Sequence, residues 1–121
     1  MVSVAMTISI PRLIVFILAG GFVATAVYAQ DAALVQRGQK VFTDQKCTIC
    51  HSIAGVGNKK GPLDAVGSTH SADDIRAWIT NAPEMAAKAK ADRKPAMKAF
   101  TSLDKADVDA LVAYLTTQKK K

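Results

Sequence analysis

The feature that most constrains this chain is a short motif in which Cys47 and Cys50 stand three positions apart and His51 follows directly. Two thiols at this spacing can bond to the two vinyl groups of one haem, while the neighbouring imidazole reaches the iron from the same side. We therefore interpret the motif as a covalent attachment site for one haem c per chain. A domain built on such a motif must fold around a large, flat and mostly apolar cofactor.

Other interpretations of the two cysteines explain less. A zinc ribbon needs four ligands, and the chain contains only these two cysteines. A thioredoxin-like redox pair would stand at the end of a strand in a βαβ unit, and no strand-rich run lies near the motif. Two unrelated core thiols beside a surface histidine would be unexpected in a chain that also carries an export signal.

That export signal is in the first 29 residues, which have the pattern of a secretory signal peptide. Arg12 precedes an apolar run, and Val27 and Ala29 supply small residues at the positions that a signal peptidase reads. We expect cleavage after Ala29 and a periplasmic or otherwise exported protein. The alternative is an uncleaved membrane anchor over 13–29, because about 17 apolar residues are at the lower limit for spanning a bilayer.

The remaining residues, 30–121, are enough for one monohaem domain, although a core of this size is marginal without a cofactor. Without Arg12, fifteen Lys and Arg stand against ten Asp and Glu, a net charge of +5. This charge favours acidic protein partners. Nucleic acid is excluded, because the chain is exported and its few aromatic residues are not interleaved with a basic stripe. We expect 119–121, three lysines, to form a solvated tail.

Helical periodicity and capping residues predict an all-α fold of about four helices packed around the haem. The first helix covers 31–44, and the last begins at Asp104. Gly38 in mid-helix costs about 1 kcal/mol relative to alanine, so we expect it to admit a close helix crossing together with Phe42. The partner would be the apolar face of the last helix, which consists of Val108, Leu111, Val112 and Leu115.

Two more helices are expected between these. One begins after the N-cap Ser71, with Asp74 at the third helical position, and ends at 81–83. The other covers the Ala- and Lys-rich residues 84–93. Trp78 lies on the first of the two, where it is either a core residue or a donor from its indole N–H to a haem propionate.

The axial ligands of the iron are expected on opposite sides of the haem. His51 is the proximal ligand, and the segment after Pro95 predicts an extended loop from which the Met97 thioether could reach the other face. Met85 is the alternative ligand, although it is more simply explained as a packing methionine. Either methionine could instead have no role beyond packing. His70 precedes a helix and is expected to face solvent.

Residues 52–63 are predicted to form a loop that orients the proximal histidine. A ligating imidazole usually donates its second N–H to an acceptor that fixes the ring, and the Pro62 carbonyl could serve. Leu63 would then close the histidine side of the haem.

With these pieces in this order, the chain resembles class I cytochrome c over essentially all of 30–121. The residues that carry the resemblance are Gly38, Phe42, Cys47, Cys50, His51, Gly61, Pro62, Leu63, Met97, Phe100, Leu111 and Tyr114. The resemblance implies thioether attachment at the two cysteines, ligation by His51 and Met97, and an acceptor role for Pro62. It also implies that the terminal helices cross where Gly38 and Phe42 meet Leu111 and Tyr114.

We therefore expect a monomeric one-electron carrier that is not an enzyme, because two protein ligands leave no open iron position for a small-molecule substrate. Basic residues that should border the haem edge predict a docking ring for acidic redox partners. These residues are Lys59, Lys60, Lys88, Lys90, Arg93, Lys94 and Lys98. A generally solvated basic surface is the alternative.

Two other functions remain open. One is a haem protein with a labile distal position that acts as a gas sensor or weak peroxidase. The other is the haem subunit of a redox complex, anchored in the membrane by 13–29.

Overall fold

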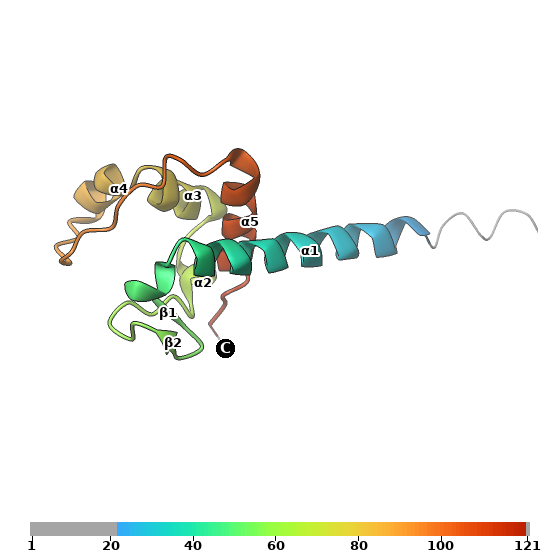
Figure 1. Cartoon of the computed structure of the whole chain (residues 1–121), viewed down its shortest axis with the longest axis horizontal. Helices are drawn as coiled ribbons and strands as arrows, with labels where there is room; N and C mark the ends of the chain where they lie inside the picture. Colours follow the sequence, from blue (N-terminus) through green and yellow to red (C-terminus); the bar gives the residue numbers. More distant parts are fainter. Residues whose placement is uncertain (1–21, 121) are drawn as a thin grey trace, which may run out of the picture.

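The computed structural model describes residues 22–120, which form five α-helices, one short 3₁₀ helix and a small hairpin (Figure 1). The all-α prediction is confirmed, with one helix more than expected. In chain order the elements are α1 (Phe22–Asp44), η1 (Cys47–Ile49), β1 (Ser52–Ile53), β2 (Val56–Gly57), α2 (Val66–Thr69), α3 (Ala72–Thr80), α4 (Ala82–Ala89) and α5 (Lys105–Thr116).

The first helix begins earlier than the sequence pattern predicted. α1 continues through Asp31 from Phe22, because no glycine or proline between positions 22 and 37 stops it. Most of the expected signal peptide, residues 1–21, lies outside the described part of the chain. Within residues 22–120, no helix combines the length and apolar character that a membrane span requires.

The terminal helices cross where Gly38 of α1 meets α5. A Cβ atom at Gly38 would lie 2.0 Å from the Ala110 carbonyl oxygen and 2.6 Å from Cβ of Tyr114, so no larger residue fits without moving one helix. Beside this contact the rings of Phe42 and Tyr114 pack edge to face, with 5.8 Å between their centroids. The predicted close crossing is confirmed.

The hydrophobic core lies around this crossing and is extended by α3, which packs on α5. All four residues of the predicted apolar face of α5 are buried in it. The core consists of Val41, Phe42, Ile75, Ile79, Val108, Leu111, Val112 and Leu115.

Side-chain caps fix the starts of α3 and α5 where the sequence predicted them. The Ser71 hydroxyl accepts from the N–H of Asp74 at 3.1 Å, and the Asp74 carboxylate accepts from the N–H of Ser71 at 3.3 Å, which completes a capping box. Asp104 accepts from the N–H of Asp107 at 2.7 Å.

The helix predicted over 84–93 is shifted toward the N-terminus. α4 begins at Ala82, with Pro83 in its first turn. The N–H groups of a first turn have no partner within the helix, so a proline costs nothing there. Pro83 therefore starts α4 and does not only end α3. The helix ends at Ala89, because Lys90 adopts the left-handed conformation with φ of 51°.

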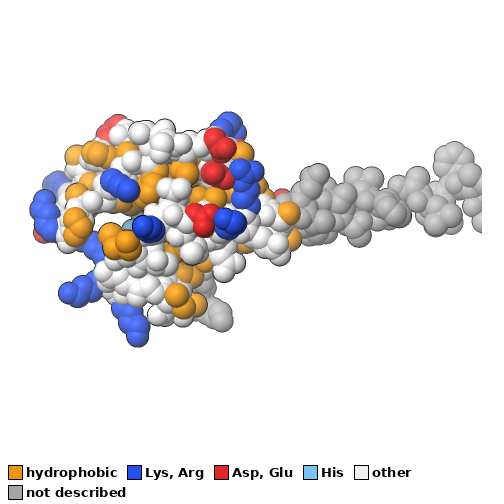
Figure 2. All heavy atoms as spheres, in the orientation of Figure 1, with side chains coloured by type: hydrophobic (Ala, Val, Ile, Leu, Met, Phe, Trp, Pro, Cys, Tyr) orange, Lys and Arg blue, Asp and Glu red, His pale blue; other side chains and the backbone are white. Residues whose placement is uncertain are grey.

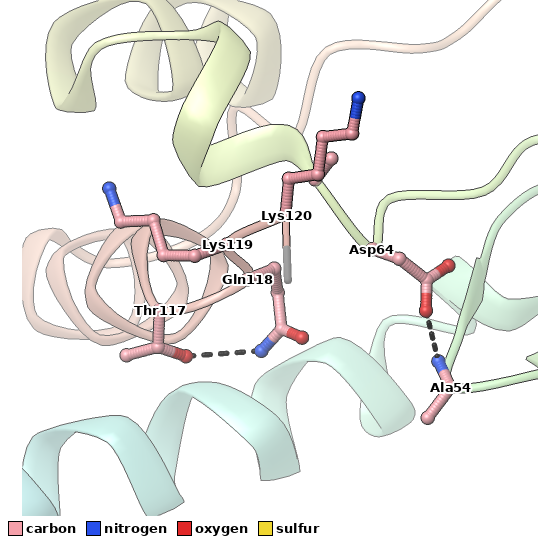
Figure 3. A pocket seen from close by; sticks show the side chains of 7 residues that line it. Ala54, Asp64, Thr117, Gln118, Lys119 and Lys120 are labelled. Carbon is pink, nitrogen blue, oxygen red and sulfur yellow. Dashed lines mark hydrogen bonds between the residues drawn. The ribbon is translucent and has the colours of Figure 1, made fainter.

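The C-terminal segment lies against α2, and Lys119 and Lys120 are exposed to solvent, as the sequence predicted. The Gly67 N–H donates to the Gln118 carbonyl at 2.8 Å, the Lys119 ammonium donates to the Gly67 carbonyl, and the Lys120 N–H donates to the Ser68 hydroxyl at 2.9 Å. Gln118, Lys119 and Lys120 border a pocket of about 500 Å³ (Figure 3). None of the predicted haem-site residues lines that pocket.

Candidate haem attachment site

The attachment motif lies at a sharp turn between α1 and the hairpin. Lys46 adopts the left-handed conformation with φ of 57°, which ends the α1 path and starts η1 at Cys47. Cys47 and Cys50 are half-buried free thiols, and Cys47 also packs against the core. Burial raises the pKa of the Cys47 thiol to about 11, so this thiol is protonated at neutral pH.

The imidazole of His51 is oriented by a backbone carbonyl. Its Nδ1 lies 3.1 Å from the Gly61 oxygen, and because a carbonyl only accepts, Nδ1 carries the proton and donates. The Nε2 atom is then unprotonated and free to bind a metal. Burial lowers the pKa of His51 more than the Gly61 contact raises it, and the Arg93 guanidinium lowers it further, which favours the neutral imidazole that iron requires.

The acceptor is therefore Gly61, and the prediction of Pro62 for this role is wrong. Ser52 pairs with Pro62 as a parallel bridge, in which the Ser52 N–H donates to Gly61 at 3.1 Å and the Leu63 N–H donates to Ser52 at 2.8 Å. In such a bridge the carbonyl of the central residue faces away from the partner, so the Pro62 oxygen points away from Ser52, the residue next to His51.

The other predicted site residues come from α3, α4 and the segment before α5. Trp78, Met85 and Met97 are all half-buried, and none belongs to the core cluster. Leu63 is also half-buried but packs against the core. His70 is exposed at the end of α2, which confirms its predicted position in solvent.

The loop that carries Met97 is anchored at its end by a hydrogen bond from the Phe100 N–H to the Ile79 carbonyl at 2.8 Å. The prediction of a loop over 94–100 is confirmed, since these residues form neither helix nor strand; the chain bends at Lys94 and Pro95. The Lys98 ammonium lies over the Phe100 ring, 5.1 Å from its centroid.

Arg93 makes a contact that sequence reasoning missed. Its Nη2 atom donates to the Cys50 carbonyl at 2.6 Å, although the two residues are 43 positions apart. The sequence marked Arg93 only as one of several exposed basic residues, and no local pattern distinguishes it from Lys90 or Lys94.

All seven predicted docking residues are exposed. Lys88 pairs with Glu84 on α4 at 2.7 Å, whereas Lys59, Lys60 and Lys98 form no ion pair among the described residues. The basic side chains lie mainly on the side of the molecule away from the start of α1 (Figure 2).

The described residues fit a haem. The two thiols and the oriented imidazole supply the attachment and ligand atoms, and two thioethers, Met85 and Met97, are half-buried. Leu63 and Phe100 pack against the core but are themselves only partly buried, so each leaves apolar surface that a flat group could contact. In Figure 2 the molecule is hollowed on this side, with hydrophobic and basic side chains at the border.

Comparison with known proteins agrees with this site. The family model described as cytochrome c matches residues 35–119. Cytochrome c oxidase subunit 2 of Alkalihalophilus pseudofirmus is 26% identical over 95 residues, which cover 71% of this chain and 26% of that protein. The chain thus spans about a quarter of the length of that relative. No solved structure matched the chain.

The family match includes the attachment motif, the crossing of α1 with α5 and the segment that carries Met97. It covers well over half of the chain. The chain belongs to the cytochrome c family, and its cofactor is a covalently bound haem c.

Proposed function

We propose that this protein is an exported one-electron carrier in which Cys47 and Cys50 hold the haem and His51 and Met97 ligate its iron. Membership of the cytochrome c family indicates haem-based electron transfer between redox proteins. The haem, when bound, supplies an iron that exchanges one electron. The ligand roles, the export and the choice of partners are our proposal.

The observation that carries the proposal is the contact between His51 and Gly61. It fixes the imidazole with Nε2 free, beside the two thiols that would attach the haem on the same side. A second protein ligand on the opposite face would leave no position for a substrate, which suits a carrier rather than an enzyme. Met97 fits this role because it lies in a loop that can adjust to the iron, whereas Met85 is held within α4.

Replacing each methionine tests the ligand assignment. We expect Met97→Ala to lose the absorption band of a methionine-to-ferric-iron bond, and the matched variant Met85→Ala to keep it. If Met85→Ala loses the band instead, Met97 is not the ligand.

We also propose that the exposed basic residues near the haem side, the side of the molecule where Cys47, Cys50 and His51 lie, form the docking ring for acidic partners. Their charges would accelerate association with an acidic redox protein, and salt would screen the effect. The bimolecular rate of electron transfer should therefore fall steeply with ionic strength. A rate that does not change with salt would mean an ordinary solvated surface.

A second function follows from the relative, which is named as a subunit of an oxidase. In this alternative the chain is the membrane-anchored haem subunit of a redox complex, and residues 13–29 are the anchor. Mass spectrometry of the isolated protein separates the two, because a carrier released by cleavage should begin at or near Gln30. A mass that includes 13–29 would favour the anchored subunit.

A further inference from the structure

The segment that carries Met97 is held to the rest of the molecule by few contacts. The Ala91 N–H donates to the Ala86 carbonyl at 2.9 Å. Further along the chain, the next backbone hydrogen bond runs from the Phe100 N–H to the Ile79 carbonyl, at 2.8 Å. Between these two anchors, within the described chain, no backbone hydrogen bond holds 92–99. Backbone of this kind opens at low cost in free energy.

Arg93 supplies the side-chain hydrogen bond that ties this segment to the attachment motif. Its Nη2 donates to the Cys50 carbonyl at 2.6 Å. The donor is a charged guanidinium and the distance is short, which is typical of a charge-assisted hydrogen bond. Cys50 directly precedes His51, so the contact joins the segment bearing one proposed ligand to the peptide bearing the other.

Gly61 makes room for this contact. A Cβ atom there would lie 2.1 Å from Nη1 of Arg93 and 2.4 Å from the Cys50 oxygen, so the guanidinium occupies the space that a side chain would fill. Gly61 is buried, and its carbonyl also accepts from His51. Gly61 therefore both orients the imidazole of His51 through its carbonyl and leaves space for the guanidinium of Arg93.

We propose that Arg93 is a positioning residue that clamps the Met97 segment to the attachment motif, and that it controls how readily an external ligand displaces the methionine from the haem iron. This inference rests on the proposed ligation by Met97. Arg93 would act through the peptide that connects it to Met97, four residues later, and not as an iron ligand. Because its partner is a backbone carbonyl, only the side chain at position 93 can be varied to test it.

Imidazole added to the ferric holoprotein measures the clamp. It reaches the iron only when the methionine and its segment move away, so its apparent affinity scales with the fraction of open molecules. Loss of one charge-assisted hydrogen bond from a largely exposed arginine should raise that fraction roughly three- to tenfold. We therefore expect Arg93→Ala to bind imidazole about three- to tenfold more tightly than the parent, with Arg93→Lys between the two.

Lys94→Ala is the matched control. It removes the same charge one residue further along the chain, and the Lys94 side chain makes no hydrogen bond in the described structure. Its imidazole affinity should equal that of the parent. An equal gain in Lys94→Ala and Arg93→Ala would show that charge alone is responsible and would overturn the clamp.

A double substitution separates this inference from the ligand assignment. In Met97→Ala the iron position is open, so the further change Arg93→Ala should no longer alter imidazole affinity. The same gain in both backgrounds would show that Arg93 does not act through Met97, and no gain in either would show that it does not hold the segment. If Met97→Ala itself keeps the methionine band and the parent affinity, the proposed ligation is wrong and the clamp falls with it.

Discussion

The crossing of α1 with α5 and the haem side of the molecule are built in opposite ways. At the crossing, Gly38 brings two backbones into contact and buried apolar side chains surround them. On the haem side the site residues are half-buried, and isolated hydrogen bonds such as Arg93 to Cys50 hold the segments together. The difference shows that close backbone contact and apolar burial fix the crossing, whereas a few polar contacts hold the segments of the haem side together.

The largest expected effect removes the cofactor from the haem side altogether. A double variant, Cys47→Ala with Cys50→Ala, has no thiol to bond to the vinyl groups, so haem should be lost on denaturation. Haem staining of a denaturing gel checks this. A haem signal in the double variant would mean that the attachment lies elsewhere.

Substitution at the crossing should destabilise the protein strongly without changing the haem ligands. In Gly38→Ala the new methyl group meets the Ala110 carbonyl, which cannot move aside alone, so we expect a loss of about 3 kcal/mol or more in the free energy of unfolding. Denaturant titration of the holoprotein measures it.

Gly55→Ala is the matched control for that titration. No atom lies within 4 Å of a Cβ at Gly55, and the cost comes only from its φ of +77°, so about 1 kcal/mol is expected. Equal losses in the two variants would contradict the close packing at the crossing.

The capping box of α3 should give an intermediate effect, since this helix joins the core to the haem side. Ser71→Ala removes the acceptor for the Asp74 N–H and should lower the free energy of unfolding by about 1 kcal/mol. Ser102→Ala, at an exposed turn serine, is the control and should change it little. The same denaturant titration would disprove the cap if both variants matched the parent.

The smallest expected effect is a dependence on acid at the packing of α3 on α5. The hydrogen bond from Lys105 and that from Arg76, each 2.6 Å from the carboxylate, lower the pKa of Asp109 below its ordinary value of 3.8. A lowered pKa in the folded state adds stability above the unfolded pKa, and this stability is lost as pH falls through the folded value. Asp109→Asn should therefore be less stable than the parent at neutral pH, and the gap should close in acid.

Urea titrations across that pH range compare the two proteins, with Asp31→Asn as a control for an exposed carboxylate. A gap that stays constant into acid would mean that the Asp109 ion pairs add no stability.

The sequence predicted those parts of the fold that depend on local signals. Ser71 and Asp104 each cap a helix by contacts within three residues, so the starts of α3 and α5 could be predicted. Gly38 and Phe42 showed the crossing, because a glycine in mid-helix needs a packing reason. The attachment motif is likewise local.

What the sequence could not provide depends on contacts between distant segments. The choice of Gly61 over Pro62 depends on the register of a bridge with Ser52, which no residue type specifies. Arg93 donates to the Cys50 carbonyl, 43 positions away in the sequence. The C-terminal lysines likewise contact α2, which is distant from them in the sequence. The short helix α2 has no periodic pattern to predict it.

The most direct test of the account is the visible spectrum of the purified holoprotein, oxidised and reduced, with and without carbon monoxide. If His51 and Met97 both ligate the iron, the spectrum should be low-spin, the oxidised form should show the methionine-to-iron band, and carbon monoxide should change nothing. A high-spin spectrum or prompt binding of carbon monoxide would mean that the distal position is open. The chain would then be a gas sensor or weak peroxidase rather than an electron carrier.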